Sequence, residues 1–142
     1  MKHTFRKIAA LAFCALLLGA CSGWRDNRKA AAYADRLEQA ESVSAEEYAE
    51  MVDFYCAALD RTFAELEPVA KEHADAVNRG DSIHAAKTEK KLSEKTAEMS
   101  ADRKDLTRLG SQLFRHVGQL PDSTRTRLFD YITSVSDRYS DY

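Results

Sequence analysis

Two long stretches of the chain place apolar or small side chains at alternating spacings of four and three residues. In the first stretch these positions are Val52, Cys56, Leu59, Phe63, Leu66, Ala70, His73 and Val77. In the second they are Leu92, Thr96, Met99, Arg103, Leu106, Gly110, Leu113, Val117 and Leu120. Such spacing gives a helix one continuous stripe for packing against a partner helix. The pattern predicts an antiparallel coiled-coil hairpin about 50 Å long.

Turn and capping signals divide the chain into four expected helices, covering residues of about 26–41, 45–79, 82–117 and 123–140. Gly80 suits the left-handed end of a helix, and Gly110 would allow the ring of Tyr55 or Phe54 to approach closely. The expected N-terminal caps are Ser44 in a capping box with Glu47, Asp81 or Ser82, and Asp122 or Ser123. Since no stretch alternates apolar and polar residues as a strand would, we predict an all-α fold, a small helical bundle built on the hairpin.

Large apolar side chains are concentrated at one end of the predicted hairpin. They crowd residues 48–66 and 106–120, which lie opposite each other, whereas residues 69–100 keep mainly Val77, Ile83, Leu92 and Met99. The short first and last helices both connect at the rich end, where the core would be closed by Leu128, Ile132, Val135 and Tyr139. We therefore expect a four-helix bundle there and a thinly packed arm that projects roughly 20–25 Å beyond it.

The N-terminus has the three parts of an export signal. Residues 1–7 carry three basic groups and no acidic one, residues 8–18 are uninterruptedly apolar, and Gly19 and Ala20 precede Cys21. A membrane-spanning helix needs about 20 apolar residues, and this run is too short for one. Residues 1–20 are therefore predicted to be a cleaved signal peptide.

The segment Leu18-Gly19-Ala20-Cys21 resembles the lipobox of bacterial lipoproteins. The resemblance covers residues 1–21 and implies cleavage before Cys21, a diacylglycerol thioether on that residue and an acylated amino terminus. Ser22 in place of Asp implies, by the rule for enterobacterial lipoproteins, the outer membrane facing the periplasm. Residues 21–25 would form a short linker and residues 26–142 a single helical domain. The alternative is a plain secreted protein with a chance cysteine near the cut.

The charge of the expected mature chain limits its partners. Loss of three basic residues with the signal leaves eighteen basic and twenty-three acidic residues, a formal net charge of −5. This sign disfavours nucleic acid and electrostatic attraction to anionic lipid. We therefore expect the protein to contact the bilayer through the acylated Cys21.

Cys56 is the only cysteine left unmodified in the mature chain, since Cys14 leaves with the signal and Cys21 carries lipid. An intramolecular disulfide is therefore excluded. The thiol is expected to pack in the core and to be inert, and the alternative is an intermolecular disulfide.

His73 and His84 flank the predicted turn near several carboxylates, and are weak candidates for a zinc or copper site. Their spacing matches no helical metal-binding pair, and His73 also fits the apolar stripe, so we expect neither metal nor cofactor.

Three classes of function remain open. The favoured hypothesis is a non-enzymatic envelope lipoprotein whose arm or bundle face docks another envelope protein, or a second copy of itself. The second is a client-binding chaperone or stress-response protein, which would expose a contiguous apolar face. The third is an enzyme or a metal carrier, for which the chain has no nucleophile elbow and no phosphate-binding loop.

Overall fold

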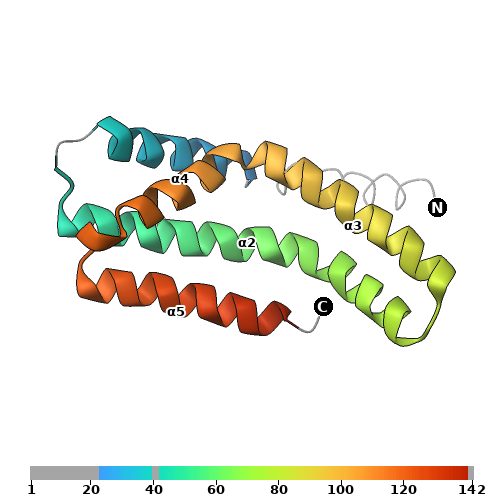
Figure 1. Ribbon diagram of the computed structural model, residues 1–142. Coiled ribbons are helices and arrows are strands. Elements are labelled where there is room, and N and C mark those ends of the chain that lie inside the picture. The colour runs from blue at the N-terminus through green and yellow to red at the C-terminus, as the bar shows by residue number, and fades with distance from the viewer. Residues whose placement is uncertain (1–22, 40–41, 141–142) are drawn as a thin grey trace, which may run out of the picture.

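The computed structural model describes residues 23–39 and 42–140, and the regular structure of these residues is helical (Figure 1). A helix over residues 23–39 is followed by α2 (Ala45–Asn78), α3 (Ser82–Asp102), α4 (Lys104–Arg115), the short 3-10 helix η1 (Val117–Gln119) and α5 (Asp122–Tyr139). The five α-helices in this part of the chain pack as a small bundle, and α2 and α3 form a long hairpin. The all-α prediction is confirmed for the described residues.

The local signals that start and turn the hairpin act as the sequence predicts. Ser44 Oγ accepts a hydrogen bond from the Glu47 amide at 3.1 Å, and the Glu47 carboxylate accepts one from the Ser44 amide at 3.4 Å. Gly80 has a φ of 69°, a backbone conformation that residues other than glycine rarely adopt. Asp81 caps α3 by accepting a hydrogen bond from the His84 amide at 3.0 Å.

The core lies at the end of the hairpin where α2 meets α4. Figure 1 shows the first helix and α5 running beside this end, while the turn between α2 and α3 projects beyond both. The fully buried residues of the core include Ala30, Ala34, Val52, Leu109, Leu113 and Leu128. Met99 departs from the expected contrast between the two ends, because it is only 6% exposed while Leu59 is half-buried. It lies one helical turn before α4, where the bundle begins.

The predicted stripe of α2 is wrong at its far end, where Val77 is 54% exposed, and Ile83 beyond the turn is 85% exposed. The reason is that α2 buries two faces, and the sequence pattern merged them. Cys56 and Phe63 belong to the face toward α5, where Phe63 stacks on Tyr139 with 5.2 Å between ring centroids. The residues that face α3 and α4 include Tyr55, Leu59, Thr62 and Leu66, and His73 contacts Ala85 and Thr88 of α3.

The continuous helix expected over residues 82–117 is interrupted at Arg103, whose φ of −115° and ψ of 31° separate α3 from α4. A residue of the first helix, Asn27, contacts the chain just after this interruption. Asn27 Oδ1 accepts hydrogen bonds from the amides of Asp105 at 2.7 Å and Leu106 at 3.3 Å. These are first-turn amides that lack a partner within their own helix, so Asn27 caps α4 from outside.

The expected cap of the last helix by Asp122 or Ser123 is also wrong, because α5 begins without a side-chain cap. Arg125 organises this corner instead. Its guanidinium donates to the carbonyl oxygens of Val117 at 2.9 Å and Leu120 at 3.0 Å, and it pairs with the Asp122 carboxylate at 3.3 Å. The Asp122 carboxylate therefore pairs with Arg125 instead of capping α5.

Candidate functional site

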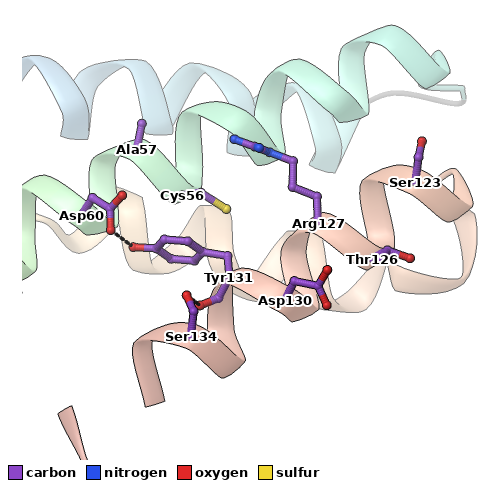
Figure 2. Close-up of a pocket in the computed structure, with 9 residues that line it drawn as sticks. All are labelled: Cys56, Ala57, Asp60, Ser123, Thr126, Arg127, Asp130, Tyr131 and Ser134. Carbon is purple, nitrogen blue, oxygen red and sulfur yellow. Dashed lines mark hydrogen bonds between the residues drawn. The ribbon is translucent and has the colours of Figure 1, made fainter. Parts of the chain in front are cut away.

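A pocket of ≈ 780 Å³ lies between α2 and α5 (Figure 2). Its lining combines residues of α2 with residues of α5, namely Cys56, Ala57, Asp60, Ser123, Thr126, Arg127, Asp130, Tyr131 and Ser134. A thiol, two carboxylates, a guanidinium and a phenol thus meet in one place. These are the residue types used in nucleophilic and acid–base catalysis, so their protonation and pairing decide what the pocket can do.

Cys56 is buried and unreactive in this setting. The residue is 3% exposed, and burial raises the pKa of its thiol to about 11. The charge of Arg127 acts in the opposite direction, but Asp53 and Asp60 offset it. Since only the thiolate is a nucleophile, Cys56 is inert near neutral pH, and the prediction that it packs in the core is confirmed.

Two polar side chains of α5 that line the pocket pair with carboxylates of α2. Tyr131 donates a hydrogen bond to Asp60 Oδ1 at 2.7 Å, and burial together with this carboxylate raises the pKa of the phenol well above its usual range. Arg127 forms an ion pair with Asp53 of α2. These contacts hold α5 against α2. In this pocket Tyr131 and Arg127 of α5 therefore serve the packing of α5 on α2.

The two histidines near the turn have separate partners. His73 Nδ1 lies 3.1 Å from the carbonyl oxygen of Ala85 and 3.0 Å from Thr88 Oγ1. Because a carbonyl can only accept, Nδ1 carries the proton and donates it. His84 Nε2 faces a carboxylate oxygen of Glu72 at 3.4 Å. Within residues 23–39 and 42–140, no three His, Cys, Asp or Glu side chains are grouped so that they could hold a metal ion.

Two residues with a defined structural role were not recognised from the sequence. Asn27 caps a helix that is 78 positions away, and no local pattern signals that contact. Arg103 is almost completely buried and pairs with Glu65 of α2 at 2.9 Å. A signal for Arg103 did exist, because an arginine in the middle of an apolar stripe needs a specific partner.

Comparison with protein-family models, with curated proteins and with solved structures found no match. Cys21, the predicted lipidation site, lies outside the described residues, as does the expected signal peptide. No helix among the described residues is long and apolar enough to span a membrane. The arguments for function therefore rest on the arrangement of this chain's own residues.

Proposed function

We propose that this protein is a non-enzymatic lipoprotein of the bacterial envelope that docks another envelope protein. The proposed anchor is Cys21, on the basis of the export signal and the lipobox-like segment that ends at this residue. The proposed docking element is the arm, which we define as residues 69–100 of the hairpin between α2 and α3. Two acyl chains or more would hold the protein stably on a membrane.

The exposure of Val77 and Ile83 is the observation that carries the docking proposal. These side chains lie on either side of the turn at the tip of the arm, and are 54% and 85% exposed. Full burial of such a side chain contributes about 1.5–3 kcal/mol. The tip lies outside the core cluster, so within this chain nothing described covers the two groups, whereas a partner surface would.

The flanks of the tip carry exposed charges that a partner can engage. Glu72 lies 3.7 Å from Lys91 and 3.4 Å from His84, and Lys90 lies 3.9 Å from Glu94. Exposed pairs of this kind contribute little to stability, so exchanging them for charges on a partner costs little. An apolar tip bordered by such charges is suited to recognising a complementary helix.

A client-binding chaperone is the weaker alternative. It would expose one contiguous apolar face. The large exposed apolar side chains of the described residues instead fall in three sets, namely Trp24, the two tip residues, and the neighbouring rings of Phe114 and Phe129.

Metabolic labelling with an alkyne fatty acid tests the anchor. Cells producing the wild-type chain should incorporate the label into this protein and retain it in the membrane fraction. The Cys21→Ser variant should lose both properties, while Cys56→Ser, the matched control, should keep them. A Cys21→Ser variant that still carries label would overturn the proposed anchor.

Site-specific photo-crosslinking in cells tests the docking surface. A crosslinking residue at Ile83 or Lys87 should capture one discrete envelope protein, and the double change Val77→Ser with Ile83→Ser should abolish capture from Lys87. Phe129 is the control position, since it is exposed on α5 away from the arm. Capture from Phe129 but not from the arm would show that we chose the wrong surface. Capture of a second copy of this chain would replace the proposed partner by a homo-oligomer.

A further inference from the structure

The start of the first helix exposes one aromatic and three basic side chains on the same side. These residues, which we call the basic–aromatic patch, are Trp24, Arg25, Arg28 and Lys29. At 3.6 residues per turn, their positions span an arc of about 140° around the helix axis. The other side of the same turns, with Asp26 and Ala30, is buried in the bundle, whereas Trp24 is 61% exposed. A large apolar ring therefore lies at the surface among cations.

The exposed side of these turns carries positive charge only. Asp26 is the one acidic residue among residues 23–34, and its carboxylate accepts two hydrogen bonds at 2.8 Å from the guanidinium of Arg61 in α2. Arg25 has no ion-pair partner among the described residues. The cations of Arg28 and Lys29 lie over aromatic rings instead of beside carboxylates, with Arg28 5.3 Å from the ring centre of Trp24. The described residues therefore leave the charge of the patch available to an anionic surface.

Tryptophan beside arginine and lysine is the combination that suits the headgroup region of a membrane. The indole ring is apolar and has a single N–H donor, so it is favoured where apolar and aqueous surroundings meet. Each basic group close to an anionic membrane strengthens binding about fivefold. Salt screens charges that are more than about 10 Å apart, so the net negative charge of the whole chain acts only weakly on a patch that touches the surface.

The place of the patch in the molecule also favours a membrane as the partner. Trp24 is three residues after the proposed lipid site at Cys21, and three residues of chain reach at most about 11 Å. An anchor at Cys21 would therefore hold the patch at the headgroups. A Cβ on the neighbouring Gly23 would be 3.0 Å from Nη2 of Arg103, the residue at which α3 ends, so the patch lies partway along the hairpin.

We propose that the basic–aromatic patch docks on an anionic lipid surface, with the indole of Trp24 among the headgroups and the three basic side chains on lipid phosphates. This inference rests on the proposed anchor, which brings the patch to the membrane. It adds a dependence on lipid charge that the acyl chains alone do not have. It also adds a second point of contact, which restrains the orientation of the anchored protein.

Trp24 is the only tryptophan of the chain, so its intrinsic fluorescence reports on the patch directly. The protein purified from cells is incorporated into vesicles of phosphatidylcholine alone, or of phosphatidylcholine with phosphatidylglycerol. In the anionic vesicles the emission should shift to shorter wavelength and should be quenched by brominated phospholipid. Both effects should be weaker in phosphatidylcholine alone, and high salt should reduce them in the anionic vesicles.

Removing two charges of the patch should weaken its docking. Arg25→Gln with Arg28→Gln should shift the equilibrium between docked and undocked patch about twentyfold and lower the quenching in anionic vesicles to that in neutral ones. Lys71→Gln with Arg115→Gln is the matched control, because it removes the same charge from exposed residues of α2 and α4 and should keep the quenching. Quenching is the ratio of emission with unbrominated and brominated lipid for each variant, so a direct effect of Arg28 on the indole cancels.

Flotation of the same vesicles separates this proposal from the proposed anchor. Protein that floats with both kinds of vesicle, but whose Trp24 is not quenched, would retain the anchor and overturn the docking of the patch. Equal quenching in neutral and anionic vesicles, or an equal loss in the control variant, would overturn the recognition of lipid charge by these residues. Protein that floats only with anionic vesicles would support the patch and contradict the anchor, and protein that floats with neither would overturn both.

Discussion

The ring of Tyr55 occupies the space in which a side chain at position 110 would lie. A Cβ atom on Gly110 would be 2.5 Å from Tyr55 Oη and 2.8 Å from Cζ. The sequence predicts this close approach from the glycine in an otherwise good helix, and leaves Tyr55 and Phe54 as alternatives. The structure confirms Tyr55, whereas Phe54 packs against Tyr33 with 5.4 Å between ring centroids.

Replacing Gly110 by alanine should therefore destabilise the protein. Overpacking in a core costs about 1–3 kcal/mol, and the better helix propensity of alanine returns about 1 kcal/mol, so we expect a net loss of roughly 1 kcal/mol. Urea unfolding followed by circular dichroism measures the change. Gly118→Ala is the matched control, because nothing lies within 4 Å of its added Cβ. Equal stability of Gly110→Ala and the wild type would contradict the close contact.

Removing the external cap of α4 should also destabilise the fold. Asn27→Ala deprives the amides of Asp105 and Leu106 of their acceptor, and losing a cap of this kind costs about 0.5–2 kcal/mol. Urea unfolding is again the measurement. Asn78→Ala is the control, since Asn78 is exposed at the last position of α2. Equal losses in the two variants would show that the capping contact contributes nothing.

The contrast between Asn27 and Ser44 shows how far this fold can be predicted from its sequence. Ser44 caps a helix through a partner three residues away, so its role follows from a local pattern. Asn27 acts on a helix 78 positions away, and that contact exists only after the helices have assembled. Because they follow from local patterns, the helices and the turn at Gly80 are predicted correctly from the sequence. The interruption at Arg103 is not.

The same difference between local patterns and long-range contacts applies to the residues of the candidate site. The burial of Cys56 follows from its place on an apolar stripe. Its neighbour Tyr131 could not be assigned in advance, because α2 and α5 meet through a face that the spacing merged with the hairpin face. Arg103 was visible in an apolar stripe, but its pairing with Glu65 depends on how the helices are arranged.

The thiol of Cys56 should react slowly until the protein unfolds. With a pKa of about 11 instead of the usual 9.0, its thiolate fraction at pH 8 is about a hundredfold lower than that of a free thiol. Iodoacetamide modification of a chain carrying Cys14→Ser and Cys21→Ser measures this single thiol, and urea-unfolded protein is the reference. Modification of the folded chain at the rate of the unfolded one would contradict the burial.

The same raised pKa predicts a loss of stability at high pH. Folding favours the protonated thiol, so this contribution is complete below pH 9, the pKa of the exposed thiol, and is lost as the pH rises to about 11. The free energy of unfolding of the wild type should therefore fall more steeply between pH 9 and 11 than that of Cys56→Ala, which has no titrating group there. Parallel pH profiles for the two proteins would contradict the prediction.

If Cys21 is the lipid anchor that we propose, the position of Gly23 predicts how the protein lies on a membrane. Gly23 is two residues after the proposed lipid site, and a Cβ on it would be 3.0 Å from Nη2 of Arg103, partway along the hairpin. The first helix leads from there toward the core end, while α3 extends about 30 Å in the opposite direction. An upright molecule would push the arm into the bilayer, so we expect the protein to lie along the membrane surface or to tilt with the tip of the arm toward the membrane.

A fluorophore at Asn78 should then be quenched by headgroup-labelled lipid at least as strongly as one at Gln119. Stronger quenching at Gln119 would mean that the arm points away from the membrane, and Cys21→Ser provides the unanchored baseline for both positions.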